Sequence, residues 1–282
     1  MKKLHLIIIP LLFSFILCIN ESSKNIKQRI KSKYKINQKF GKNIEKLKKK
    51  SMTRYQYDSN NNKIIDSSYN PNDTTLIYLK KSIYDVNNNK IETTFYNSDG
   101  EIADIAGLSK QVYKYDDDNN LIEESLYPVN GKLGFYCNYI YDDGNCILKS
   151  NFLADGSLSS STKYVYDSKN NIIKLYVYNE DGSLNHTYKN RYDSDNNKIE
   201  SYYYNESSFI YINYYKYKYD NNGNIIEELF YDNSSELVSS HSFSYNLNNN
   251  IIEDLEYSYK FQFGKLEKRL MSKVIFEYEY YH

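Results

Sequence analysis

The chain is poor in the residue types that usually build catalytic and metal centres. Its 282 residues include no Trp, three Cys and four His. The histidines, His5, His186, His241 and His282, are far apart in the sequence, and neither a phosphate-binding glycine loop nor a Cys-x-x-Cys pair occurs. The sequence therefore predicts no enzymatic activity, no cofactor and no metal centre.

Proline and aliphatic residues are also scarce, whereas tyrosine is abundant. The chain has three Pro and 34 Tyr. A tyrosine ring can pack across neighbouring strands while its hydroxyl stays in water, and a cross-strand aromatic pair contributes roughly 0.2–1 kcal/mol. This composition favours a broad single sheet over a two-layer β-sandwich with an aliphatic core, which is the alternative fold.

Net charge is a further absence, because 36 basic residues balance 36 acidic ones. Residues 24–50 hold twelve Lys or Arg and one acid, Glu45, a net charge of +11. Lys2, Lys3 and Glu21 add +1, so residues 51–282 carry −12. A neutral total conceals a basic segment joined to an acidic body.

Residues 21–50 are predicted to be a basic linker or a basic amphipathic helix. Apolar residues recur at three- and four-residue multiples, which is typical of such a helix. It would lie on an anionic membrane surface, and no nucleic-acid partner is expected. A solubilising spacer and a helix covering the open end of a sheet are the alternatives. The apolar residues are Ile26, Ile30, Phe40, Ile44 and Leu47.

Residues 1–20 are predicted to be a signal peptide or a short anchor. Two lysines precede an apolar run from Leu6 to Ile19, which is shorter than the roughly 20 residues of a membrane span. We expect export to the cell surface, the outer envelope or the extracellular space. Cys18 stands where a lipoprotein signal carries its lipidated cysteine, and its removal with the signal is the alternative. The basic residues that follow oppose translocation, so a membrane tether by an uncleaved segment stays open.

Residues 51–257 are a repeat with a period of about 26 residues. The clearest copy is YKYDNNGNII at 217–226, which is predicted to be strand, turn and strand. A fixed period in this range is typical of repeat architectures in which each unit packs on its neighbours. The eight copies align on Asp58, Asp85, Asp116, Asp142, Asp167, Asp193, Asp220 and Asn246.

One position of the repeat accepts only Asn or Gly, which indicates a backbone requirement. These two residue types tolerate the left-handed region best, so the position is predicted to have a positive φ in a hairpin turn. The residue after it is always Asn. The eight residues at this position are Asn61, Asn88, Asn119, Gly144, Asn170, Asn196, Gly223 and Asn249.

A second turn, marked by Asp-Gly or Asn-Gly in several copies, lies halfway along each period. Each period therefore holds two strands, and the eight copies predict an all-β antiparallel meander of about sixteen strands. We expect it to form one elongated, twisted or curled sheet. Residues 258–282 are predicted to be strands that cap its exposed edge.

The repeats resemble the YD repeats of the RHS family. The motif is Tyr-x-Tyr-Asp, an Asn/Gly turn and then an Asp-Gly hairpin, and its clearest matches are at 115–116, 141–145, 166–167 and 219–224. The resemblance covers residues 55–257. It implies a secreted or surface protein built from a spiralling strip of hairpins. We expect eight copies to be too few to enclose a passenger domain and expect no toxin-like or protease-like domain after them, and no active-site residue carries over.

The turns resemble the start of a calcium loop but depart from it. Asp58-x-Asn60-x-Asn62 places oxygen ligands at alternate residues, yet Lys63 stands where glycine is required and Tyr69 stands at the twelfth position. Hydrogen bonds of Asx turns explain the same residues without a metal.

The two cysteines of the body are predicted to be free thiols. In a hairpin that turns at 143–144, Cys146 lies opposite Tyr141, which leaves Cys137 about 13 Å away along the strand.

Two functions are compatible with these features. In the first, an exported, non-catalytic scaffold of adhesin type binds a protein or a carbohydrate through its tyrosines; the alternative role of these tyrosines is only to hold strands together. In the second, a structural envelope protein uses its basic arm to bind an anionic surface. The candidate binding surface is Tyr202, Tyr203, Tyr204, Tyr214, Tyr215 and Tyr217.

Overall fold

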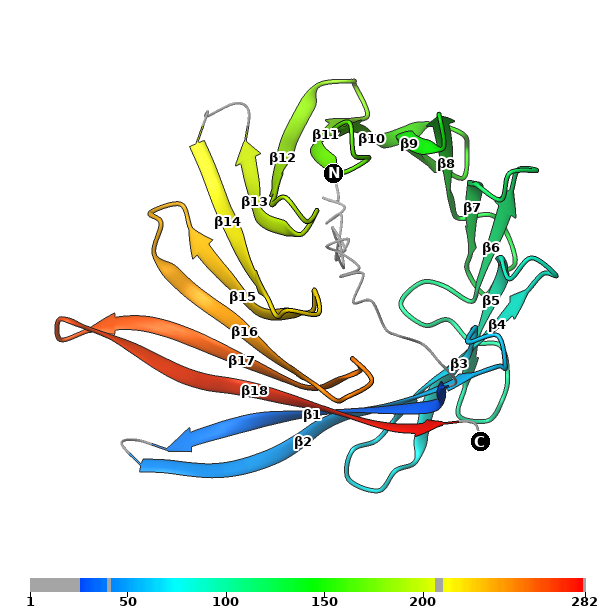
Figure 1. Cartoon of the computed structure of the whole chain (residues 1–282). Coiled ribbons are helices and arrows are strands. Elements are labelled where there is room, and N and C mark those ends of the chain that lie inside the picture. The colour runs from blue at the N-terminus through cyan, green and yellow to red at the C-terminus, as the bar shows by residue number, and fades with distance from the viewer. Residues whose placement is uncertain (1–25, 40–41, 206–209, 281–282) are drawn as a thin grey trace, which may run out of the picture.

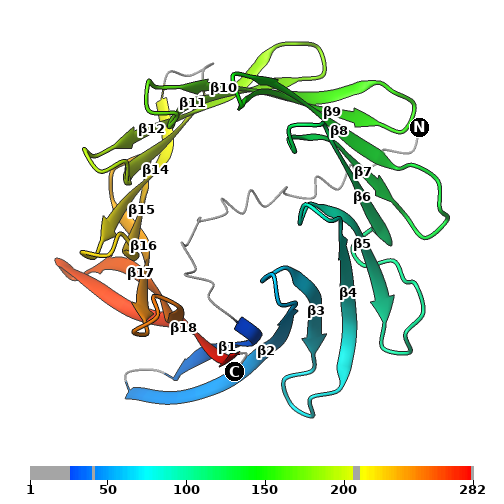
Figure 2. The same cartoon turned by 45° about the vertical axis from the view of Figure 1, so that its right-hand side comes forward.

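The fold is a closed antiparallel β-barrel. The computed structural model describes residues 26–39, 42–205 and 210–280, and within them eighteen strands form one sheet. Each strand pairs with the next strand of the chain, and the first also pairs with the last, which closes the ring in Figures 1 and 2. The strands are β1 (Ile26–Lys39), β2 (Lys42–Tyr57), β3 (Lys63–Tyr69), β4 (Leu76–Tyr84), β5 (Lys90–Asn97), β6 (Lys110–Tyr115), β7 (Leu121–Tyr127), β8 (Phe135–Asp142), β9 (Asn145–Leu153), β10 (Leu158–Tyr166), β11 (Ile172–Asn179), β12 (Leu184–Tyr192), β13 (Lys198–Asn205), β14 (Ile210–Tyr219), β15 (Ile225–Asp232), β16 (Leu237–Tyr245), β17 (Ile251–Gln262) and β18 (Lys265–Tyr280).

The predicted open sheet, elongated or curled, is wrong, and so is the alternative sandwich. β1 pairs with β18 in a register that runs from Ile26 opposite Tyr280 to Lys35 opposite Ser272. Because strands twist with one hand, a long repeat of hairpins curls, and pairing its two ends closes the ring. β18, which was expected to cap an open edge, lies between β17 and β1.

Within the predicted basic linker or helix at 21–50, residues 26–39 and 42–50 form strands instead. β1 and β2 form a long hairpin in which Gln28 lies opposite Gln56 and Ser32 opposite Met52. The sequence carried a signal for this, because Lys27, Arg29, Lys31, Lys33 and Lys35 alternate with less polar residues at the two-residue period of a strand. β1 supplies the strand that closes the ring.

The predicted turn geometry is confirmed in all eight copies. In seven of the copies, all but the one at Asp142, the Asp or Asn at the start of the turn accepts hydrogen bonds that define an Asx turn. At Asp220, the donors are the backbone N of Asn222 (2.9 Å) and of Asn224 (2.8 Å). The Asn-or-Gly position has a positive φ throughout: Asn61 (62°), Asn88 (64°), Asn119 (64°), Gly144 (74°), Asn170 (62°), Asn196 (65°), Gly223 (79°) and Asn249 (57°).

The tyrosine that precedes the turn joins each repeat to the one before it. Its hydroxyl donates a hydrogen bond to a backbone carbonyl at the start of the preceding repeat's second strand, at 2.7–3.0 Å. The repeated tyrosine therefore links neighbouring hairpins by a hydrogen bond. The pairs are Tyr84–Lys63, Tyr115–Lys90, Tyr141–Leu121, Tyr166–Cys146, Tyr192–Ile172, Tyr219–Lys198 and Tyr245–Ile225.

The asparagines of the turns form a second tie. The Asn that follows the positive-φ position donates a side-chain hydrogen bond to the positive-φ Asn of the next copy. Examples are the bonds from Asn62 to Asn88 (2.9 Å) and from Asn89 to Asn119 (2.7 Å). Further bonds run from Asn171 to Asn196 (3.2 Å) and from Asn224 to Asn249 (3.4 Å). The positive-φ Asn thus serves both the backbone and the contact between repeats.

Side chains alternate between two faces of the wall. The strand register places Tyr55, Tyr113, Tyr139, Tyr188 and Tyr217 on one side of the wall, which we call the inner face. Burial also raises the pKa of each of these hydroxyls. Figure 1 shows the turns from β12 to β13 and from β14 to β15 bending into the ring. The residues at the alternate positions form the outer face.

Candidate functional site

The outer face carries an aromatic residue at the same place in all eight repeats. This residue is the last or second-last of the second strand in seven repeats and lies within β17 in the eighth, and every member of the set is half-buried. We call the part of this surface on β12 to β15, with Lys189, Tyr202, Tyr204, Tyr214, Lys216 and Tyr231, the outer aromatic wall. The eight repeated aromatics are Tyr69, Tyr96, Tyr127, Phe152, Tyr178, Tyr204, Tyr231 and Tyr257.

Three tyrosines of the outer aromatic wall stack in a row across three strands. The Tyr202 and Tyr214 rings are 5.4 Å apart, and those of Tyr214 and Tyr231 are 4.7 Å apart with an interplanar angle of 2°. The register places these residues directly opposite one another on neighbouring strands. The row therefore presents ring edges and hydroxyls at the surface, with the ring faces turned toward each other.

Lysines and acids complete the outer aromatic wall. The Lys189 ammonium lies 4.2 Å from the centre of the Tyr204 ring, and Lys216 lies 5.8 Å from Tyr214 and 5.7 Å from Tyr231. Glu200 accepts from Tyr202 at 2.7 Å. The result is a surface of aromatic edges surrounded by hydrogen-bond donors and acceptors.

The structure divides the six tyrosines that the sequence grouped together. Tyr202, Tyr204 and Tyr214 face outward, whereas Tyr203, Tyr215 and Tyr217 line the inner face. The inner three are packed: the Tyr203 ring is 5.1 Å from Tyr188, the Tyr215 ring is 5.0 Å from Phe230, and Tyr217 is 9% exposed. Consecutive residues of one strand alternate in direction, so a run of three tyrosines cannot form one surface.

An ionisable cluster lies on the inner face of β15, β16 and β17. His241 Nδ1 is 2.7 Å from an Asp254 oxygen, and the register places Glu228 and Glu256 on either side of His241. Burial by itself would lower the pKa of His241. The hydrogen bond to Asp254 and the negative charges of Asp254, Glu228 and Glu256 have the larger effect, so the pKa of His241 is raised above its usual value. Burial raises the pKa of the Glu228 carboxyl. In the part of the chain that the structure describes, no group of three or more His, Cys, Asp and Glu is arranged to hold a metal ion.

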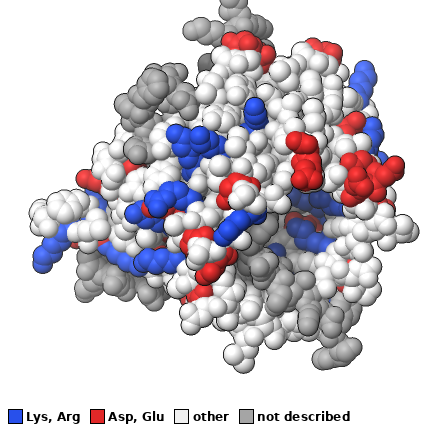
Figure 3. All heavy atoms as spheres, turned by 45° about the horizontal axis from the view of Figure 1, so that its top comes forward, with Lys and Arg blue, Asp and Glu red and all other residues white. Residues whose placement is uncertain are grey.

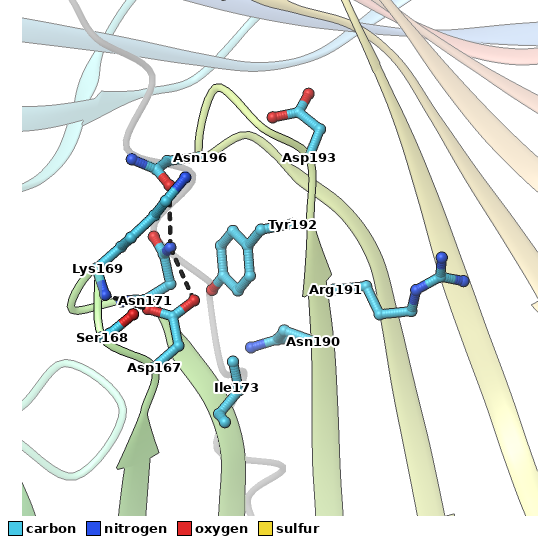
Figure 4. Close-up of a pocket in the computed structure, with 10 residues that line it drawn as sticks. All are labelled: Asp167, Ser168, Lys169, Asn171, Ile173, Asn190, Arg191, Tyr192, Asp193 and Asn196. Atoms are coloured by element: carbon cyan, nitrogen blue, oxygen red, sulfur yellow. Dashed lines mark hydrogen bonds between the residues drawn. The ribbon is translucent and has the colours of Figure 1, made fainter.

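A pocket opens between the turns of two neighbouring repeats (Figure 4). Asn190 lies at its wall, in the position that Tyr113, Tyr139, Tyr164 and Tyr217 occupy in other copies, so the pocket lies in a copy that lacks this ring, as the copy with Ser82 also does. Two of its polar side chains bond to backbone carbonyls. The Asn190 amide donates to the Ile172 carbonyl at 2.8 Å, and Lys169 Nζ donates to the Ser194 carbonyl at 3.1 Å.

These contacts make the pocket part of the seam between repeats. The Asn171 amide bridges the Asp167 carboxylate (3.1 Å) and the Asn196 side chain (3.2 Å), as Figure 4 shows, and equivalent bonds occur at other repeats. The pocket therefore reflects a local change in the repeat, and we place the candidate site on the outer aromatic wall.

The prediction of free thiols is confirmed. Cys146 lies opposite Tyr141, and Cys137 lies opposite Asn151. The buried Cys137 Sγ is 3.1 Å from the Asn151 side-chain oxygen, and burial raises its pKa to about 11. Cys18 and the predicted signal segment 1–20 lie outside the described residues. Within those residues, no helix is long and apolar enough to cross a membrane.

Comparison with known proteins gives similar structures but no family. No family model and no curated protein matches the chain. Among solved structures, it is similar to a porin-like protein from Bacteroides uniformis (TM-score 0.49, 8% identity, 90% of this chain and 98% of that chain covered). A porin-like protein from Bacteroides vulgatus gives a TM-score of 0.40 at 12% identity, with 90% and 98% covered.

A chain of the TcdB2-TccC3-Cdc42 complex is also similar, though weakly. Its TM-score is 0.19 at 10% identity, and the match covers 85% of this chain and 19% of that one. The resemblance to YD repeats thus rests on the sequence motif, because no family model supports it.

Proposed function

We propose that the protein is an exported, non-catalytic scaffold that binds carbohydrate chains through its outer aromatic wall. The observation that supports this most directly is the continuous row of Tyr202, Tyr214 and Tyr231 beside Lys216. Export is supported by the apolar run from Leu6 to Ile19.

The proposal requires an outer face in contact with water, and its charges favour this. Arg191 and Glu200 are 2.6 Å apart, and Lys218 and Glu227 are 2.5 Å apart, on the outer face of β12 to β15. A transmembrane barrel has an outward apolar band, and a Lys or Arg at the bilayer midplane costs roughly 2–4 kcal/mol. Other charged outer residues are Arg54, Lys81, Glu92, Lys110, Lys114, Glu123, Lys163, Lys174, Glu253 and Lys273.

Carbohydrate suits the outer aromatic wall because the wall is rich in polar groups. A sugar presents many hydroxyls around a ring with apolar faces, so it pairs with phenol hydroxyls, ammonium groups and carboxylates at an aromatic surface. The core of a stable protein interface is instead depleted of charged residues. Glu200, Lys189 and Lys216 lie beside the row of tyrosines, which favours a sugar over a protein partner.

Replacing Tyr214 and Tyr231 together by Ser is expected to weaken glycan binding by at least about tenfold, since aromatic residues dominate the binding energy of such sites. The experiment compares the wild-type chain and this variant on a glycan array and then by calorimetry with the best glycan. Circular dichroism confirms that the variant keeps its β-structure.

A matched control removes an equivalent outer pair far from the row. Tyr136 and Phe152 stack at 4.9 Å and 14° on the outer face of β8 and β9. The Tyr136→Ser/Phe152→Ser variant is expected to bind glycan as the wild type does. Equal losses in both variants, or no glycan bound by the wild-type chain, would refute the proposal.

A further inference from the structure

Two long hairpins project from one rim of the barrel. β17 and β18 have 12 and 16 residues, and β1 and β2 have 14 and 16. β1 pairs with β18 only as far as Lys35 opposite Ser272, and beyond this point the two hairpins diverge from each other as they leave the wall (Figure 1).

The tip of the β17–β18 hairpin is apolar and exposed. Phe263 is 100% exposed, Phe261 is 66% exposed and Leu266 is 52% exposed. Phe261 lies opposite Leu266 across the turn, so the three side chains gather at one end. Burial in the fold therefore does not explain these residues.

The backbone at the tip makes the choice of phenylalanine costly. Phe263 has a φ of 50°, in the left-handed region that disfavours a bulky side chain and that Asn or Gly fills at the repeated turn position. An aromatic residue that is both strained and fully exposed stabilises neither the turn nor the core. Its apolar side chain is available for a contact outside the barrel.

Basic residues surround this tip. Lys260, Lys265, Lys268 and Arg269 lie on the hairpin, against one acid, Glu267. The neighbouring β1–β2 hairpin adds further exposed lysines, and Figure 3 shows Lys and Arg side chains along the side to which the hairpins project. The exposed lysines of that hairpin are Lys33, Lys35, Lys48 and Lys50.

We propose that the two hairpins dock on an anionic lipid surface. Phe261, Phe263 and Leu266 enter the boundary between headgroups and acyl chains, and the lysines of both hairpins contact the anionic headgroups. An apolar tip within a basic surround matches the two attractions that hold peripheral proteins on membranes. This surface lies at the hairpin tips, so it is separate from the outer aromatic wall and does not depend on the proposed glycan site.

The absence of Trp makes a local test available. Phe263→Trp introduces the sole indole of the full chain, and its emission reports on this residue alone. We expect a blue shift and quenching by brominated lipids with phosphatidylcholine vesicles that contain phosphatidylglycerol. The signal is expected to weaken with pure phosphatidylcholine and in high salt, which screens the lysines. Binding through the apolar run at Leu6–Ile19 would leave this emission unchanged.

The control places the indole at the other end of the same strand. Leu247 is fully exposed in the turn that precedes β17, so Leu247→Trp is expected to show neither shift nor quenching with the same vesicles. Equal quenching at both positions, or none at residue 263, would overturn the proposal. A blue shift at residue 263 that grows with protein concentration without vesicles would assign the tip to a second copy of the chain and would also overturn it.

A second comparison measures the contribution of the tip. Phe261→Ser/Phe263→Asn removes both rings and places at residue 263 an Asn that tolerates the positive φ, so the variant is expected to fold. The partition coefficient of this variant to phosphatidylglycerol vesicles is expected to be about tenfold lower than that of the Phe263→Trp variant. Ile83→Ser/Val86→Asn removes similarly exposed residues (52% and 97%) at the opposite rim and is expected to change nothing. Equal partition of the two double variants would contradict the proposal.

Discussion

Replacing Ser32 by Pro is expected to lower the free energy of unfolding by about 3 kcal/mol or more. Ser32 lies in β1 opposite Met52 of β2 on one side and Ile275 of β18 on the other, and it is 7% exposed. A proline in a strand with two neighbours removes a hydrogen bond of the ladder and clashes with the adjacent backbone. Because β1 closes the ring, the loss falls on the seam between β1 and β18. Urea denaturation followed by circular dichroism measures it.

A proline at a turn is the matched control. Val86 follows Asp85 in a turn closed by the bond from Asn88 N to Asp85 O (3.1 Å), and it is 97% exposed. Proline is favoured at this second turn position, so Val86→Pro is expected to change the unfolding free energy by less than about 0.5 kcal/mol. If the two variants unfold at the same urea concentration, β1 is not an internal strand of the sheet.

Replacing Asn119 by Val is expected to cost about 2–3 kcal/mol. The φ of 64° at Asn119 costs a β-branched residue about 1–2 kcal/mol, and loss of the bond from the Asn89 amide (2.7 Å) costs about 1 kcal/mol more. The measurement is the shift of the urea midpoint, converted with the slope of the transition.

Asn119→Gly separates the two causes. Glycine accepts the positive φ, as Gly144 and Gly223 do at the same position, so this variant is expected to lose only the amide bond, about 1 kcal/mol. A Val variant as stable as the Gly variant would mean that the backbone does not impose the Asn-or-Gly position.

The local structure was predictable from the sequence because it depends on few neighbouring residues. An Asn-or-Gly position at a fixed period specifies a positive φ, and the Asp that precedes it specifies an Asx turn, so the turns around Asn61 and Gly223 followed directly. The opposition of Cys146 and Tyr141 followed from the turn in the same way. These inferences need only the two-residue period of a strand.

Closure was not predictable in this way. It depends on the twist and tilt of many strands, which accumulate around the ring, and on a pairing between Ile26 and Tyr280 at opposite ends of the chain. β1 was also missed, because the apolar residues of this basic segment recur at the three- and four-residue spacing of a helix. Its lysines, such as Lys31, Lys33 and Lys35, alternate at the two-residue period of a strand.

The sequence predicted only part of the candidate site, because the site also depends on which strands are neighbours. The sequence marked the tyrosines of β13 and β14, but which of them share a face follows from the strand period. The neighbour that completes the row, Tyr231, lies one strand further, opposite Tyr214, and the register was needed to find it. The exposed Phe263 could have been found from the sequence, because a Phe-Gly pair stands at the turn of the last hairpin.

The closed ring is tested most directly by cross-linking the seam. In a Ser32→Cys/Ile275→Cys variant, the two thiols lie on directly opposed residues of β1 and β18, at the roughly 4.5–5.5 Å between Cβ atoms typical of such pairs. A short bis-alkylating reagent and peptide mass mapping measure the link, and Thr53→Cys/Ser68→Cys on the adjacent strands β2 and β3 is the positive control. The closed barrel predicts that both pairs become cross-linked within one chain. A link in the control pair and none between residues 32 and 275 would show that the sheet is open.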